Sequence, residues 1–182
     1  GVNCISGLSS TVFIEEFDNL SAWTGDIGTG TTLGDWNSHS GATGSTNTGP
    51  SGAHSGMNYA YVEASSGFNT TVSMVSPLID LTQATDSAEM SFWMHAYGQD
   101  LGTLNVGIST SQTGPFTTIF TWSGELQGAE TDPYQQVGIR LDSMVGQAFY
   151  IEFAYTIGNS FAGDIAIDLL KIDACVSCPS PT

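Results

Sequence analysis

The sequence has very few basic side chains. Lys and Arg together number 2 in a chain of 182 residues, against 18 Asp and Glu, which gives a formal net charge of −16. Contacts to nucleic-acid phosphates and anionic lipid head groups need Lys and Arg, so this imbalance argues against both partners. Charged residues of all kinds make up 11% of the chain, below the roughly 25% usual in globular proteins. Gly, Ser, Thr and Asn take their place, which is typical of a secreted protein that meets cations, neutral glycans or other proteins.

The sequence also lacks a run of about 18 apolar residues, so it predicts no membrane insertion. It opens at Gly1 without a signal peptide, and we expect a module of a larger secreted chain with neighbouring domains.

Cysteine is scarce, with 3 residues at Cys4, Cys175 and Cys178. A single Cys-x-x-Cys pair, with no second pair and no adjacent His, is weak support for a zinc or redox site. We predict instead a disulfide from Cys4 to either Cys175 or Cys178, formed in an oxidising compartment, with one thiol left over.

Signals of catalysis are missing as well. His39, His54 and His95 lie in unrelated segments, and neither His-Glu-x-x-His nor Gly-x-Ser-x-Gly occurs. Paired carboxylates could indicate a glycosidase, but a metal site explains the acids better. We therefore predict that the protein is not an enzyme.

What the sequence does contain is a β pattern. Short runs of β-branched and aromatic residues alternate with turn residues, and no stretch keeps a helical period. This predicts an all-β fold, a two-sheet antiparallel β-sandwich, as one domain over 1–178, with 179–182 as the start of a linker. Residues 25–56 are expected to form a surface excursion anchored by Leu33 and Trp36. The expected strands are Thr11–Phe17, Tyr59–Ala64, Thr71–Val75, Ala88–Tyr97, Thr103–Ser109, Phe116–Trp122, Tyr134–Leu141, Gln147–Ile157 and Asp164–Asp173.

Four carboxylates stand inside this apolar pattern. Glu16 and Asp18 are two apart on the first expected strand, so both should point to one face. Asp164 and Asp168 likewise share a face of the last strand. First and last strands often lie side by side in such sandwiches, which would gather the four acids without a basic residue. A structural Ca²⁺ would then hold them together, although solvated acids at strand ends are the alternative interpretation.

An aromatic row follows from the same alternation. Phe92, Met94 and Ala96 are expected in the core, which puts Trp93, His95 and Tyr97 on the opposite face. Sugar rings stack on aromatic faces and their hydroxyls need polar partners, so this row, with Trp36, is a candidate glycan site. The alternative is a structural row that lies under the 25–56 excursion.

Several blocks of the sequence resemble the MAM domain. They are Phe17-Asp18 followed by Leu20 and Trp23, Asp35-Trp36, Gly49-Pro50, His54, Tyr59, Ser76-Pro77, Ser91-Phe92-Trp93-Met94-His95-Ala96-Tyr97-Gly98, Trp122 and Gly163-Asp164-Ile165-Ala166-Ile167-Asp168. The resemblance runs from about Glu16 to Cys175. It implies a jelly-roll-like β-sandwich of an extracellular multidomain protein, with adhesion or oligomerisation as its role and no catalysis. It also implies a cation near Asp168, with the His54-Ser55-Gly56 turn lending backbone carbonyls.

The cysteines depart from the family pattern. Glu16 and Ser21 stand where the first pair is expected, Glu89 stands near the third position, and Cys175 alone matches the fourth. The disulfides of the family therefore do not carry over, and Cys4 is the candidate replacement.

Two functions fit these observations. The first is a carbohydrate-binding module, appended to a secreted enzyme, whose polar and aromatic surface suits a neutral polysaccharide. The second is a protein-adhesion, oligomerisation or spacer module of a cell-surface protein.

Overall fold

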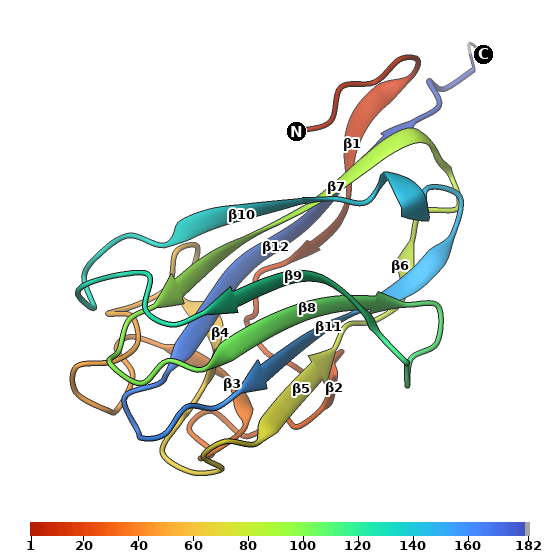
Figure 1. Ribbon diagram of the computed structural model, residues 1–182. Coiled ribbons are helices and arrows are strands. Elements are labelled where there is room, and N and C mark those ends of the chain that lie inside the picture. Colours follow the sequence, from red (N-terminus) through yellow and green to blue (C-terminus); the bar gives the residue numbers. More distant parts are fainter. Residues whose placement is uncertain (181–182) are drawn as a thin grey trace.

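A computed structural model describes residues 1–180 of the chain and shows two antiparallel sheets packed face to face (Figure 1). The expected all-β sandwich is confirmed. Part of the expected linker, residues 181–182, lies outside the described residues. Residues 142–144 form a short 3-10 turn, and nothing in the described part is a helix long and apolar enough to cross a membrane.

Each sheet has six strands. The first follows the order β10-β7-β12-β4-β3, with β1 also paired to β12, and the second follows β2-β5-β11-β8-β9, with β6 also paired to β11. The strands are β1 Leu8–Glu15, β2 Thr24–Gly25, β3 Trp36–Ser40, β4 Asn58–Val62, β5 Thr71–Val75, β6 Ile79–Asp80, β7 Ala84–Ala96, β8 Thr103–Ser109, β9 Thr117–Ser123, β10 Gln135–Arg140, β11 Ala148–Thr156 and β12 Ile165–Val176.

All nine expected strands are present, displaced by a few residues at their ends, but three strands were missed. β2 and β6 have two residues each, too few to show a period. β3 lies inside the 25–56 excursion, which is therefore not a plain loop, and its Asn37 to Ser40 are polar. Leu33 is 56% exposed, so the expectation that it anchors the excursion was wrong.

The core lies between the two sheets and is rich in aromatic rings. Phe92 of β7 and Phe153 of β11 meet edge to face with ring centroids 5.3 Å apart. Trp36 and Trp23 also pack on Phe153, at 6.4 and 6.1 Å. Rings in such tilted or edge contacts add stability beyond the area they bury. As the alternation predicts, Phe92, Met94 and Ala96 are all buried in this layer.

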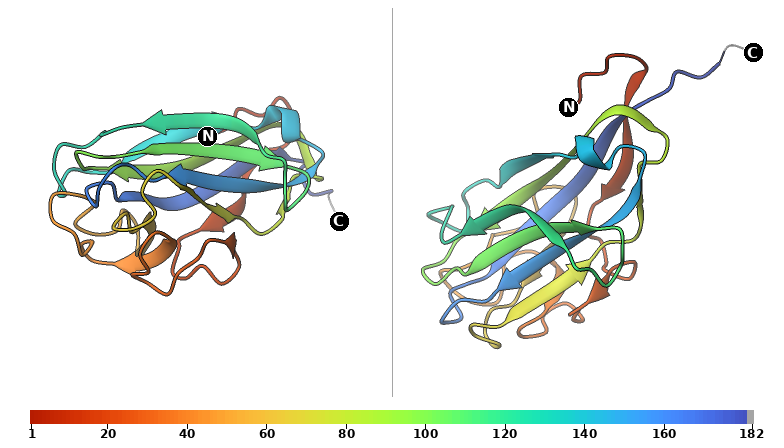
Figure 2. Two further views of the ribbon diagram at one scale, coloured as in Figure 1. Left: turned by 60° about the horizontal axis from the view of Figure 1, so that its bottom comes forward. Right: turned by 45° about the vertical axis from the view of Figure 1, so that its right-hand side comes forward.

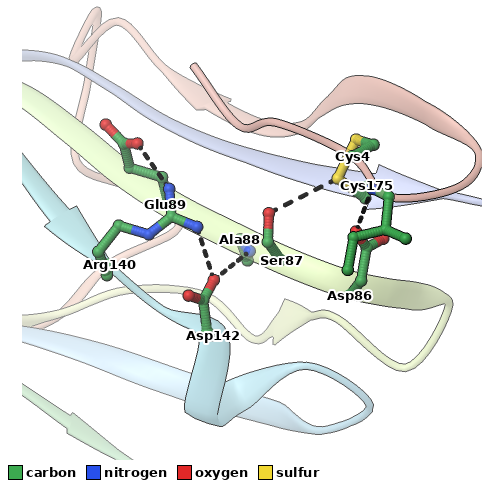
Figure 3. A network of polar contacts seen from close by, with 9 residues as sticks. Cys4, Asp86, Ser87, Ala88, Glu89, Arg140, Asp142 and Cys175 are labelled. Atoms are coloured by element: carbon green, nitrogen blue, oxygen red, sulfur yellow. Dashed lines mark hydrogen bonds and ion pairs between the residues drawn. A yellow bond between two sulfur atoms is a disulfide. The ribbon is translucent and has the colours of Figure 1, made fainter.

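The N-terminal segment lies beside the end of β12, at one end of the sandwich (Figure 2). β1 pairs with β12, as expected for the first and last strands. Cys4 and Cys175 form a disulfide there, with Cα atoms 5.5 Å apart, so the pairing left open by the sequence is with Cys175, while Cys178 is free and exposed. Ser87 lies against the disulfide, and the Asp86 carboxylate accepts the Ile5 N–H nearby (Figure 3).

Candidate functional site

The strand registers bring the sequence-predicted residues together on one face of the first sheet. On β12, Ala166 pairs with Tyr61 of β4 on one side and with His95 of β7 on the other. Asp168 pairs with Trp93. Successive residues of β7 and β12 point to opposite faces of the sheet, and the residues between these point into the core. This face therefore points away from the core. We call this surface, which includes Tyr61, Trp93, His95 and Asp168, the covered face, because loops lie over it.

Loops bury much of this face, while Trp93 and Tyr97 stay partly exposed. Tyr59, Tyr61 and His95 are each 0% exposed. They belong to, or lie beside, a second apolar cluster of Tyr59, Tyr61, Tyr134 and Ala166, against which Ala53 and Trp93 pack. Ala53 comes from the 25–56 excursion, so the row lies under that segment. His95 is buried, so the three side chains do not form the expected open platform, whereas Trp93 and Tyr97 are partly exposed.

Each member of the row is held differently. The His54 ring stacks on Trp93 with centroids 3.9 Å apart and an angle of 16°. The Tyr97 carbonyl accepts hydrogen bonds from Gly49 N and Thr48 Oγ1, both in the excursion, at 2.9 Å. The His54 stack occupies one face of Trp93, whereas Trp93 also lines a hollow beside β10.

His95 is the most deeply enclosed member. Its ring lies 5.2 Å from the Tyr134 ring, and neither ring nitrogen has a hydrogen-bond partner among the described residues. Burial lowers the pKa of His95 to about 4, so the ring is neutral at physiological pH. A neutral, enclosed imidazole cannot contact an external ligand here.

Trp36 lies on the other side of the sheet. It is 0% exposed, and its indole N–H donates to the Val72 carbonyl at 3.1 Å. The expectation that Trp36 binds a ligand was wrong, because β3 turns this ring into the core.

Two of the four predicted carboxylates meet at the 54–56 turn. The Asp168 carboxylate accepts the backbone N–H groups of His54, Ser55 and Leu169, each at 2.8 Å. Glu16 reaches the same turn through Ser55 Oγ, at 3.4 Å. Burial raises the pKa of Asp168 to about 6, and the nearby Glu16 charge adds to this despite the three N–H donors.

The other two carboxylates do not join them. β1 ends at Glu15 and Phe17 has φ 59°, so Glu16 and Asp18 do not alternate on one strand as expected. The Asp18 side chain is exposed. Asp164 is buried four residues before Asp168 on β12. Among residues 1–180, no three His, Cys, Asp or Glu side chains gather closely enough to hold a metal ion.

The part of the expected calcium site that fits is the pair Glu16 and Asp168. One carboxylate oxygen of Asp168 takes two N–H donors and the other takes one, which leaves it a free lone pair. The ion pairs of the described residues all involve Arg140, so neither acid is neutralised by a basic side chain. Positive φ angles at Phe17, Gly56 and Leu169 turn the backbone around the same point.

An open groove lies beside the covered face, and sequence reasoning missed it. One part, about 450 Å³, is lined by Trp93, Leu126, Gln127, Asp132, Pro133, Tyr134, Gln135 and Gln136. A second part, about 260 Å³, shares Leu126, Gln135 and Gln136 and adds Met94, Phe120, Trp122 and Val137. Both parts therefore follow β10, and the second part lies between the edges of the two sheets, where β9 and β10 lie near each other (Figures 1 and 2). Trp93 lines the first part and Trp122 lines the second.

The groove is preformed by the 124–134 segment. Gln127 is buried, accepts Ala96 N–H at 2.7 Å, and donates to the carbonyls of Met94 and Pro133. Tyr134 Oη donates to Gly52 at 2.9 Å, which ties the segment to the 25–56 excursion. Trp122 is fixed by a hydrogen bond from its indole to Gly124 O at 2.8 Å.

Another hollow, about 400 Å³, lies near Asp18, Asn19, Leu20 and Asn58. No aromatic side chain lines it, so it offers no surface on which a sugar ring could stack. The groove along β10 combines indole rings with amide side chains and is the better candidate for ligand binding.

Solved structures with the same fold have diverse roles. The K1 cleaved adhesin domain of Lys-gingipain from Porphyromonas gingivalis W83 is 18% identical with a TM-score of 0.60, and the match covers 92% of this chain and 99% of that one. A cyclase from Fischerella sp. TAU is 10% identical with a TM-score of 0.63, covering 94% and 100%. TmCBM61, solved with β-1,4-galactotriose, is 17% identical with a TM-score of 0.52, covering 86% and 92%. These likenesses concern the fold.

The sequence itself decides the family. Residues 16–179 match the family described as MAM domain, meprin/A5/mu, which is nearly the whole chain. This range includes both the Trp93 block and the Asp164 to Asp168 block on which the resemblance rested. The chain belongs to the MAM domain family.

Proposed function

We propose that this protein is a non-catalytic, extracellular module that binds a neutral polysaccharide in the groove along β10, and that it accompanies a secreted enzyme. The observation that carries the proposal is that Trp93 and Trp122 line two adjoining hollows, which share Leu126, Gln135 and Gln136. The Cys4–Cys175 disulfide supports an oxidising, extracellular location.

The lining suits an uncharged sugar chain. Indole rings provide apolar surface for the C–H faces of sugar rings, and the glutamine amides can both donate to and accept from hydroxyls. The formal charge of −16 opposes sulfated or uronate chains, which need cationic partners. Neutral glycans are thus the class that the groove and the charge favour together.

The lining is also unlike that of a glycoside hydrolase. Those enzymes need two carboxyl groups that flank the scissile bond. Asp132 is the carboxylate of the groove lining, and it already accepts the Gly128 N–H at 3.0 Å. Binding, rather than hydrolysis, is the chemistry that these residues support.

Affinity gel electrophoresis on a panel of neutral, sulfated and uronate polysaccharides tests the proposal. We expect retardation by a neutral polysaccharide, loss of retardation in Trp122→Ala and weakening in Gln136→Ala, whose side chain is exposed and should not affect folding. The matched control is Phe161→Ala, an aromatic residue 49% exposed outside the groove. Retardation that survives Trp122→Ala and Gln136→Ala would place the ligand elsewhere, and retardation by the anionic polymers alone would contradict the neutral class.

A second candidate function, protein adhesion or oligomerisation, is favoured by β1. Leu8, Val12 and Ile14 are 56%, 39% and 53% exposed. β1 pairs with β12 on one edge, and among the described residues its other edge has no strand partner. A free apolar edge can add a strand from another chain. Sedimentation velocity across a concentration series, with Ile14→Lys as the disrupting variant, tests this alternative.

We further propose that calcium binds between Glu16 and Asp168 and stabilises the fold. When bound, the ion would supply the positive charge that these acids lack, and saturation at a hundredfold excess over Kd raises stability by about 2.7 kcal/mol. Thermal unfolding with calcium and with a chelator should differ by several degrees. Asp168→Asn should remove the difference, whereas Asp18→Asn should keep it because that side chain is exposed. Equal melting curves in calcium and chelator would contradict the proposal.

A further inference from the structure

A second pair of acids is buried at the other end of the covered face. Asp164 is 0% exposed and Glu63 is 5% exposed. Ala166 pairs with Tyr61, and the same antiparallel register carried two residues further sets Asp164 opposite Glu63. Like charges directly opposite each other on neighbouring strands repel, so this pair needs a neutralising group.

The hydrogen bonds of the pair leave oxygen atoms unused. Asp164 Oδ1 accepts the Ala64 N–H at 2.8 Å, while Asp164 Oδ2 is buried and has no partner. Glu63 Oε1 accepts both the N–H and the hydroxyl of Ser65, at 3.2 and 2.6 Å. The Tyr61 hydroxyl lies beside Glu63, is buried, and has no hydrogen-bond partner either.

Basic groups do not reach this place. Arg140 is occupied by Glu89 and Asp142 (Figure 3). The His39 ring lies 5.2 Å from the Tyr61 ring, but its Nε2 contacts the Ala42 carbonyl at 3.0 Å. Two buried carboxylates and a hydroxyl, which are all oxygen ligands, are therefore neighbours, and no salt bridge among residues 1–180 reaches them.

We propose that Asp164, Glu63 and the Tyr61 hydroxyl form a second calcium site, distinct from the one at Glu16 and Asp168. Calcium takes oxygen ligands of this kind, and two carboxylates match its charge. Four residues of β12 separate Asp164 from Asp168, which is about 13 Å along a strand, so one ion cannot serve both acids. The proposal does not depend on glycan binding.

Equilibrium dialysis against calcium, with metal content measured per chain, tests the site directly. Wild-type protein should bind one more ion than Asp164→Asn or Glu63→Gln, both of which keep the size of the side chain. Asp18→Asn, whose exposed side chain belongs to neither proposed site, is the control and should bind as many ions as wild-type protein. Terbium provides a second readout, because Tyr61 should sensitise its emission and Tyr61→Phe should reduce that signal severalfold.

Two results would overturn the proposal. One is equal calcium stoichiometry in wild-type protein and in both the Asp164→Asn and Glu63→Gln variants. The other is a melting temperature that responds to pH through these two acids but not to calcium, which would assign a shared proton to the pair. If Asp164→Asn fails to fold, Glu63→Gln and Tyr61→Phe still test the calcium site, because each variant keeps the hydrogen bond from Ala64 N–H to Asp164.

Discussion

The two faces of β7 are both buried, but by different parts of the chain. On the inner face, Met90, Phe92 and Met94 pack against the second sheet. On the covered face, Trp93 and His95 lie under Ala53, His54 and residues 129–132. The inner face is buried because strand alternation directs its side chains at the other sheet, whereas the covered face is buried by loops. Burial by a sheet can thus be inferred from strand periodicity, but burial by loops cannot.

The inner face should dominate stability. Phe92→Ala removes a ring that meets both Phe120 and Phe153, at 6.0 and 5.3 Å, and leaves a cavity between the sheets. We expect a loss of about 3–5 kcal/mol in the free energy of unfolding, measured by denaturant titration. A loss no larger than that of Trp93→Ala would remove the distinction between the faces.

The sequence predicted the inner face well because its period is local. The alternation of Phe92, Met94 and Ala96 identified core positions without any knowledge of their partners. The choice of Cys175 over Cys178 needed the register of β1 on β12, which is a long-range property.

The candidate site was predicted less well for the same reason. The groove joins Trp122 of β9 to Gln136 of β10, and β9 and β10 belong to different sheets. Trp122 stood out in the sequence as an aromatic residue, but nothing local paired it with Trp93. Asp164 and Asp168 were expected on one face and are found there, yet Asp168 binds the backbone of the 54–56 turn and Asp164 binds that of Ala64.

The covered face should reveal itself by its response to acid. His95 has a folded-state pKa of about 4, below its ordinary 6.5, because it is buried. Between these values the unfolded chain binds more protons than the folded one, so stability falls as pH falls from about 6.5 to about 4. His95 should contribute up to about 1.4 kcal/mol per pH unit to this fall.

Urea unfolding at a series of pH values measures this contribution as the difference in slope between wild-type protein and His95→Gln. The two slopes must be compared because Asp164 and Asp168 also titrate. Their raised pKa values make stability rise as pH falls, and they do so equally in both proteins. Parallel curves would mean that the imidazole is hydrated, and that the loops do not seal this face as the sheet seals the other.

The smallest effect should come from the edge of the cover. His54→Ala removes the ring stacked 3.9 Å from Trp93 but leaves the His54 N–H that Asp168 accepts. We expect a loss of about 0.5–1.5 kcal/mol and stronger quenching of tryptophan fluorescence by acrylamide, because one face of Trp93 becomes accessible. Ser51→Ala, in the same excursion but bonded through its backbone to Glu130, is the control and should change neither quantity. Unchanged quenching in His54→Ala would show that other loop residues close over Trp93, so that the cover depends on the excursion as a whole rather than on this stacked pair.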